Sequence, residues 1–379
     1  DKRIPFEIVG GKTGETPKAG QTLTLITKGP NNSYLVFVVL GSKNRFEDMV
    51  ILTNWAHDSF YPKQKDPLQK MNWILATSTA AWGTRDAHSV VTFKDKMYLI
   101  GGINGNAVVD PNGMVRYWDA PHMSDIWVTD NGINWNMITD KAPWKNRRSV
   151  TTVVFNDKLW LMGGWSQYDN KYDNRIWFTE DGEQWILATS TTPRWEGREG
   201  HTLNVLNGKM YLIGGVNFTK RITFNDVWSS VDGVNWKQET SNAPWTPRYD
   251  HAVSTFDNAL YLTGGLHINT HDTESEVWVS TDGIQWEHRT PEWPSRHGHI
   301  SYVHDGVLWI TGGWDAVPDT GINDTWFTHD GKKWLKTKTN GPWTGREDHM
   351  GEVFKGKMWL TGGMDSTERW NSDVYYSSI

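Results

Sequence analysis

The sequence predicts an all-β protein that folds as one closed β-propeller of seven four-stranded antiparallel blades. Three observations lead to this prediction: a motif that recurs with fixed spacing, two hairpin-like segments in every repeat, and 25 tryptophans among 379 residues. Four antiparallel strands in a repeat of about fifty residues are typical of one propeller blade. Because repeat folds grow by adding units, the length permits a single domain that spans residues 1–379.

The recurring motif is Trp-x-x-Arg, followed by a Gly-Gly pair that begins sixteen residues after the arginine. The six arginines are Arg85, Arg147, Arg198, Arg248, Arg296 and Arg346. The glycine pairs begin at Gly101, Gly163, Gly214, Gly264, Gly312 and Gly362. A spacing that is identical in six repeats indicates one repeated structural unit.

Each repeat contains two hairpins. Between the arginine and the Gly-Gly pair lie two strand-like runs separated by a turn, as in His201–Leu206 and Met210–Ile213. After the pair come a variable loop and an aromatic strand that ends in an Asp-Gly or Asn-Gly turn, as in Val227–Ser230 followed by Asp232-Gly233. We name the four strands of a repeat A to D. Residues 79–379 are predicted to form six such blades.

The segment before residue 79 lacks the motif but contains four strand-like stretches. These are Gln21–Thr27, Tyr34–Leu40, Met49–Thr53 and Trp73–Thr77. Residues 21–78 are therefore predicted to be a degenerate first blade. The last blade ends after strand C, Val374–Ser377, and needs an outer strand. Within residues 1–20, Ile4–Ile8 alternates apolar residues and is predicted to supply that strand and close the ring.

A Gly-Gly pair after strand B with a downstream tryptophan resembles the kelch repeat, as in the galactose oxidase propeller and bacterial kelch-like proteins. The resemblance covers residues 82–379 and extends weakly to the rest. It implies the fold and little about function, because kelch-like propellers include oxidases, epimerases, specifier proteins and ubiquitin-ligase adaptors. The Tyr and Cys copper chemistry of galactose oxidase is excluded, since the chain has no cysteine. Turns such as Asp282-Gly283 resemble a sialidase Asp-box but lack one residue between Asp and Gly.

The composition of the chain limits the classes of partner that we expect it to bind. A formal net charge of -6 provides no basic field for nucleic acid, so no nucleic-acid partner is expected. No apolar run is long enough to span a bilayer, so no membrane partner is expected. The chain begins at Asp1 rather than Met, which is consistent with a removed leader. We therefore expect a secreted or periplasmic protein, and a monomer.

The face that carries the Trp-x-x-Arg motifs and the variable loops after Gly-Gly is predicted to hold the function. There the six arginines are expected to converge as a cationic ring that binds carboxylate, sulfate or phosphate. The alternative is that each arginine stacks on its own tryptophan or bonds to a nearby carbonyl. A histidine three residues after the arginine is interpreted as a brace of the inner strand. These histidines are His88, His201, His251, His299 and His349, and Val150 replaces the sixth.

Most tryptophans follow the repeat and are assigned to the core. Four that do not follow it lie in loops between strands B and C: Trp118, Trp165, Trp314 and Trp370. Such rings are expected to stack on the apolar face of a sugar ring. The alternative is that each packs its loop onto the neighbouring blade.

Four loop residues are candidate acids and bases. They are His267, His271, Tyr168 and Tyr117. A divalent metal held by His267, His271 and Asp272 stays open, although this spacing aligns ligands only on a helix and the segment is a loop. No cofactor is expected.

The expected ligand is an acidic saccharide, carrying uronic acid or sulfate, at the channel mouth. If the protein is an enzyme, proton abstraction next to a carboxylate, as in a polysaccharide lyase, fits these residues. One alternative is a non-enzymatic kelch interaction module that binds an acidic peptide of a partner protein. Another is a kelch-like sugar epimerase or mutarotase, which differs only in the fate of the abstracted proton.

Overall fold

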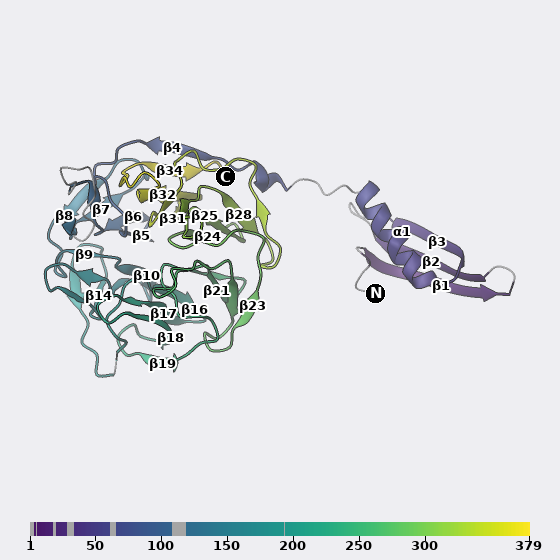
Figure 1. Cartoon of the computed structure of the whole chain (residues 1–379), viewed down its shortest axis with the longest axis horizontal. Helices are drawn as coiled ribbons and strands as arrows, with labels where there is room; N and C mark the ends of the chain where they lie inside the picture. Colours follow the sequence, from purple (N-terminus) through teal and green to yellow (C-terminus); the bar gives the residue numbers. More distant parts are fainter. Residues whose placement is uncertain are drawn as a thin grey trace. The chain divides into compact units, whose positions relative to one another are not determined.

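The computed structural model describes residues 4, 6–17, 20–28, 34–60, 66–107, 119–192 and 194–379. The chain forms two compact units, Asp1–Gln69 and Lys70–Ile379 (Figure 1). The sequence predicted a single domain over residues 1–379. The structure has two units because the first residues fold separately from the propeller. No described helix is long and apolar enough to cross a membrane.

The first unit is a three-stranded antiparallel sheet with one helix. Its strands, in sheet order, are β1 (Glu7–Thr16), β2 (Gly20–Lys28) and β3 (Tyr34–Ser42). The helix α1 (Arg45–Phe60) begins with Glu47 and Asp48 in its first turn, where the helix dipole favours carboxylates. It packs on the sheet through a core that includes Leu25, Phe37 and Met49.

This unit corrects the predicted seventh blade. The predicted strand Met49–Thr53 lies in α1, because Met49, Leu52 and Ala56 recur with helical spacing and face the sheet. The predicted closing strand Ile4–Ile8 overlaps β1, which pairs with β2 rather than with the last blade. Residues 21–78 therefore do not form a blade.

The second unit is a propeller of six four-stranded antiparallel sheets in the part of the chain described (Figure 1). Blade 1 contains β5 (Ser89–Phe93), β6 (Lys96–Ile100), β7 (Ile126–Thr129) and β8 (Asn136–Thr139). Blade 2 contains β10 (Thr151–Phe155), β11 (Lys158–Met162), β14 (Ile176–Thr179) and β15 (Trp185–Leu187). Blade 3 contains β16 (Thr202–Leu206), β17 (Lys209–Asn217), β18 (Ile222–Ser230) and β19 (Lys237–Thr240).

The other three blades follow the same order. Blade 4 contains β20 (Ala252–Phe256), β21 (Ala259–Thr263), β22 (Val277–Ser280) and β23 (Glu287–Arg289). Blade 5 contains β24 (Ile300–His304), β25 (Val307–Thr311), β28 (Thr325–Thr328) and β29 (Leu335–Lys336). Blade 6 contains β31 (Met350–Phe354), β32 (Lys357–Thr361), β34 (Val374–Ser377) and β4 (Trp73–Thr77).

Short elements lie between the blades' strands. The short strands are β9 (Arg147–Arg148), β12 (Trp165–Ser166), β13 (Lys171–Tyr172), β26 (Trp314–Asp315), β27 (Thr320–Gly321), β30 (Arg346–Glu347) and β33 (Met364–Asp365). Two 3-10 helices, η2 (Pro67–Lys70) and η3 (Gly105–Ala107), complete the described elements.

The ring is closed by β4, which comes from the start of the propeller unit and pairs with β34 near the end of the chain. Trp73 in β4 packs edge-on against Trp343, with ring centroids 5.3 Å apart. Other blades contain the equivalent pair, such as Trp195 with Trp236 at 4.8 Å. Trp73 thus occupies the register of an outer strand in blade 6. Six blades, rather than seven, therefore account for the repeat.

Candidate functional site

The six motif arginines are framework residues. Arg198 is 1% exposed and donates from Nη1 to the carbonyl of Gly214 at 2.9 Å and from Nη2 to Asp226 at 2.9 Å. The other five are equally buried and ion-paired with an acid at the start of strand C. The six acids are Asp125, Asp173, Asp226, Glu276, Asp324 and Asp373. The prediction that these arginines bind a ligand is corrected, because each guanidinium already satisfies a carbonyl and a carboxylate of its own blade.

The repeated histidines are braces, as interpreted from the sequence. The His251 ring occupies the space beside Gly214 of the preceding blade, where a Cβ would lie 2.7 Å from Cε1. Gly312 accommodates His349 in the same way. Burial, followed by the charge of the adjacent arginine, lowers the pKa of His251 and His349 to about 3, so both are neutral. Val150 replaces the histidine beside Gly101.

A set of ionisable side chains gathers where the blades meet. The residue after each motif arginine is not constant among the blades, and we call the six the mouth residues: Asp86, Arg148, Glu199, Tyr249, His297 and Glu347. Each pairs in antiparallel fashion with the residue after its blade's Gly-Gly pair, as Arg148 does with Trp165 and His297 with Trp314. The motif and the loop between strands B and C therefore meet at one end of the propeller.

The next residue of each blade forms a ring around the axis. These six ring residues are Ala87, Ser149, Gly200, Asp250, Gly298 and Asp348, all with φ between 48° and 62°. Their backbones hydrogen-bond from blade to blade: Ser149 N donates to Ala87 O at 2.7 Å, and Gly298 N to Asp250 O at 2.8 Å. Such left-handed backbone at non-glycine residues is uncommon and is held only where the surroundings determine it.

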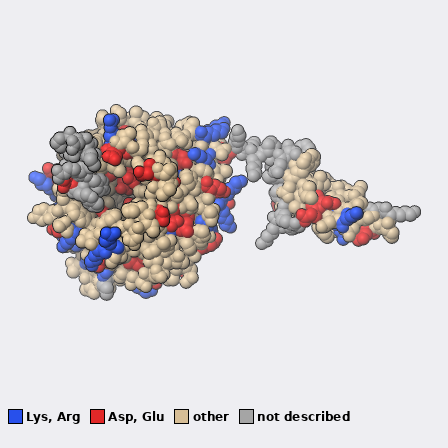
Figure 2. Space-filling view, in the orientation of Figure 1, with Lys and Arg blue, Asp and Glu red and all other residues tan. Residues whose placement is uncertain are grey.

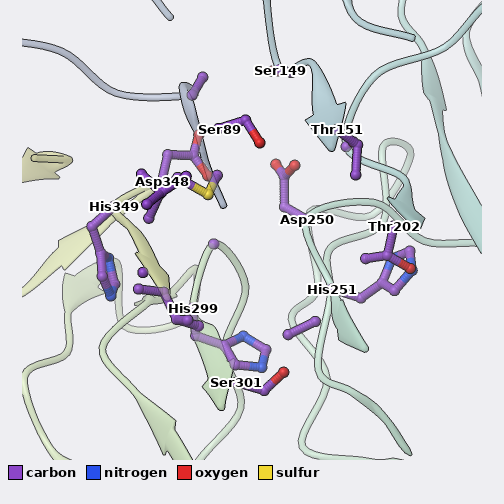
Figure 3. A pocket seen from close by; sticks show the side chains of 18 of the residues that line it. Ser89, Ser149, Thr151, Thr202, Asp250, His251, His299, Ser301, Asp348 and His349 are labelled. Carbon is purple, nitrogen blue, oxygen red and sulfur yellow. The ribbon is translucent and has the colours of Figure 1, made fainter. Parts of the chain in front are cut away.

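A cavity of about 300 Å³ lies at the ring and continues along the inner strands of the six blades. Its polar lining includes Ser89, Thr202 and Ser301 besides the ring residues. Figure 3 shows the carboxylate of Asp250 extending into the open part of this cavity. The ring therefore presents charged groups to a space that can hold a small ligand.

The site is rich in carboxyl groups. Its one guanidinium among the mouth and ring residues, Arg148, binds Glu199 through two bonds, Nε–Oε2 at 2.9 Å and Nη2–Oε1 at 3.0 Å. Burial, followed by repulsion between neighbouring carboxylates, raises the pKa of Asp86, Asp250 and Glu347. Burial and the charge of Glu199 raise the pKa of Asp348 to about 6. The site therefore exchanges protons close to neutral pH.

The structure places three of the four predicted loop tryptophans beside mouth residues. Trp165 lies 5.4 Å from the Arg148 guanidinium, and Trp314 pairs with His297; both rings are partly exposed. Trp370 is 3% exposed and lies beside Asp86, so it packs its loop rather than offering a platform. Trp118 and the predicted base Tyr117 lie outside the described residues.

The remaining predicted acids and bases do not line the cavity. Tyr168 is 69% exposed, and its ring lies 3.3 Å from Lys145 Nζ. His267 bonds Glu274 at 2.8 Å, and His271 is exposed in the same loop. In the described part of the chain, no group of three or more His, Cys, Asp or Glu side chains is arranged to hold a metal ion, so the alternative metal site gains no support.

Sequence reasoning missed the mouth residues. They lie between the repeated arginine and the repeated histidine, and the search for repeated residues passed over a position that varies. Their signal was present: one position inside an invariant motif carries an ionisable side chain in all six blades, with a different identity in most. A position that varies inside a conserved frame is typical of a binding surface built on a rigid scaffold.

The family model described as "KLHDC2/KLHL20/DRC7 Kelch-repeats domain" matches residues 87–281, which is about half of the chain. The chain belongs to the kelch-repeat family. This kelch chain is similar to kelch domain-containing protein 3 of Rattus norvegicus, with 28% identity over 167 residues, and of Homo sapiens, with 29% over 156 residues. Each match covers about two fifths of both chains: 41% for the rat protein and 38% for the human one.

Two further relatives extend the comparison. Kelch repeat protein M-T8 of Myxoma virus is 23% identical over 156 residues, which are 41% of this chain and 27% of the viral protein. The solved structure titled "Structure of YjhT" superposes with a TM-score of 0.63 at 15% identity. It covers 79% of this chain and 96% of that chain, and at this identity it shows the kelch propeller fold alone.

Proposed function

We propose that this kelch propeller binds a saccharide at the channel mouth formed by the mouth and ring residues. The observation that carries the proposal is that the repeated residues of the motif and its variable residues have different surroundings. The repeated arginines and histidines are buried in the framework, whereas the variable ring residues line a cavity and the mouth residues adjoin them in the chain. Carboxylates accept hydrogen bonds from sugar hydroxyls, and the partly exposed rings of Trp165 and Trp314 suit the C–H face of a sugar ring.

The charge of the site favours a neutral or basic saccharide over an acidic one. Five carboxyl groups face one guanidinium, and that guanidinium is already held by Glu199. An anionic ligand placed here would meet like charge, which is costly where water is excluded. The proposal therefore replaces the expected uronic or sulfated ligand. A lyase mechanism loses its support too, because it needs a free cation to neutralise the substrate carboxylate.

The size of the cavity favours a small ligand over a protein partner. About 300 Å³ is at the lower end of the range for small-molecule pockets. An acidic peptide, which the interaction-module alternative expects, would also meet the carboxyl groups of this site. The non-enzymatic interaction module is therefore the weaker alternative.

A sugar epimerase or mutarotase is the second candidate, and the raised pKa values favour it. Opening an aldose ring requires a base that takes the proton of the anomeric hydroxyl and an acid that protonates the ring oxygen. Carboxyl groups such as Asp348, with a pKa raised to about 6, hold and release a proton near neutral pH. Following the anomer ratio of freshly dissolved sugars by NMR tests this: equilibration faster than in buffer supports it, and an unchanged rate contradicts it.

The binding proposal is tested with a panel of neutral, amino and uronic oligosaccharides, titrated while tryptophan fluorescence is followed. Saturable binding of a neutral or amino member is expected, with uronic members at least about tenfold weaker. Trp165→Ala and Trp314→Ala should weaken binding, because they remove the stacking rings. Trp55→Ala, in the first unit, is the matched control. Absence of binding across the panel, or an equal loss in the control, contradicts the proposal.

A further inference from the structure

Resting on the proposed function, we infer that the saccharide carries a protonated amino group and that Asp250 and Asp348 bind it at the floor of the channel mouth. The first support is the alternation of the ring. Each of these two aspartates follows a glycine contributed by the preceding blade. A Cβ on Gly200 would lie 2.7 Å from Oδ1 of Asp250, and a Cβ on Gly298 would lie 3.0 Å from Oδ1 of Asp348. The glycines therefore leave the space that the two carboxylates occupy.

The second support is that these carboxylates lack partners. Among the described residues, neither the Asp250 nor the Asp348 side chain forms a hydrogen bond or an ion pair. By contrast, each acid at the start of strand C is ion-paired with its blade's arginine. Both residues are partly exposed and line the cavity, so water or a ligand can reach the two carboxylates. The ring therefore contains two acceptors that are open to a ligand.

The third support is the shortage of cations near the two aspartates. The charges that act on Asp250 and Asp348 are those of neighbouring carboxylates and of one cation, Arg148, which Glu199 binds. Asp86, which is 1% exposed and lies beside Trp370, is also close enough to Asp348 for the charge of one to raise the pKa of the other. The carboxyl groups around the ring therefore outnumber the nearby cation, which favours a cationic ligand.

The cationic ligand that fits this site is an organic ammonium rather than a metal ion. The described acidic and histidine side chains include no group arranged to coordinate a metal. An ammonium group needs no fixed coordination geometry, because it donates three hydrogen bonds through a rotatable bond. On a sugar ring it sits beside hydroxyls that the remaining mouth carboxylates can accept. An unacetylated amino sugar meets these requirements.

The charged neighbours set the pH dependence. The groups around the two aspartates are the mouth residues, of which four are carboxyl or imidazole groups and Arg148 is occupied by Glu199. Deprotonation of the ring carboxyls strengthens attraction to an ammonium ion. Binding should therefore tighten as the pH rises from 5 to 7, provided that the amine stays protonated, as a group with a pKa of about 8 does.

The test compares two matched sugars on the full chain by calorimetry at pH 7. Glucosamine disaccharide carries ammonium groups, and N-acetylglucosamine disaccharide is its neutral counterpart. The amine is expected to bind at least about tenfold more tightly. Asp250→Asn and Asp348→Asn should each reduce the preference for the amine over the acetylated sugar to less than about threefold, because the neutral amide no longer attracts the ammonium group. Asp305→Asn, which alters an exposed carboxylate on a turn, is the control and should leave that preference unchanged.

The outcomes separate the two proposals. Equal binding of both sugars overturns the amino-group inference and leaves saccharide binding standing. Binding of neither sugar overturns the proposed function. Tighter binding of the peptide Ala-Lys-Ala than of either sugar overturns the inference in favour of a basic protein segment. If one aspartate variant fails to fold, the other, together with the pH series on the unmodified chain, still decides the question.

Discussion

Single residues of the motif divide into framework and site. The arginine is ion-paired inside its blade and the histidine three residues later packs against a glycine of the preceding blade, whereas the two residues between them vary among the blades. The sequence predicted that the histidines brace the inner strands, because a residue that recurs in five blades more often serves the fold than a single site. It did not predict the arginine role, because the acids that bind each guanidinium lie 26 to 40 residues downstream at a variable spacing.

Removing a motif arginine should destabilise the propeller. Arg198→Met leaves Asp226 buried without its guanidinium and the Gly214 carbonyl without its donor. A loss of about 3–5 kcal/mol in the free energy of unfolding is expected, as for other broken buried pairs. Urea denaturation measures it. Lys220→Ala, which breaks an exposed pair with Glu196, is the control and should cost no more than about 1 kcal/mol. Similar effects of the two changes would contradict the framework role.

The histidines should make the propeller sensitive to acid. The folded-state pKa of His201, His251 and His349 is lowered to about 3, below the ordinary value of 6.5. Between these limits the unfolded chain binds protons that the folded chain does not, so stability falls as the pH drops from 6.5 towards 3.

His251→Val, which copies the natural Val150, tests this. Stability of the unmodified chain minus that of the variant should shrink between pH 6 and pH 4 by about 2 kcal/mol, because one titrating group is gone. Denaturation curves at the two pH values provide the comparison. An unchanged pH slope would show that this imidazole is not held neutral.

Among the elements, strand β4 decides how the propeller closes. The sequence predicted this strand correctly but assigned it to a separate blade, because the segment before it contains further apolar runs. One of those runs, Met49–Thr53, is helical, and a run of five apolar and polar residues does not distinguish strand from helix. Trp73 carried the decisive signal, since it shares the register of the tryptophans that pack edge-on in other blades.

Two truncated chains test whether β4 closes the ring. A chain that begins at Lys70 retains β4 and should unfold cooperatively, with the thermal midpoint of the propeller little changed. A chain that begins at Thr79 lacks β4, exposes the edge of β34 and leaves Trp343 without its partner. We expect it to aggregate or to melt at a much lower temperature by circular dichroism. If both chains melt alike, β4 does not close the ring.

Across the whole propeller, positive and negative charges are balanced inside the blades but not at the channel mouth. Every motif cation is neutralised inside a blade, whereas the channel mouth keeps carboxyl groups in excess. In the view of Figure 2, acidic side chains gather toward the middle of the propeller and basic ones lie mostly toward its rim. The net charge of -6 gave no indication of this distribution, because a sum over the chain does not locate charges. The sequence predicted which face of the propeller carries the site. The mouth and ring residues could be identified only from the three-dimensional structure.

The central claim is that the ring carboxylates at the channel mouth bind the ligand. A crystal structure of the full chain with glucosamine disaccharide tests it most directly. We predict the ammonium nitrogen within hydrogen-bonding distance of Asp250 and Asp348, with the sugar beside Trp165 or Trp314. A ligand bound at the outer loops that carry Tyr168 or His271, with the ring carboxylates unoccupied, would contradict the account.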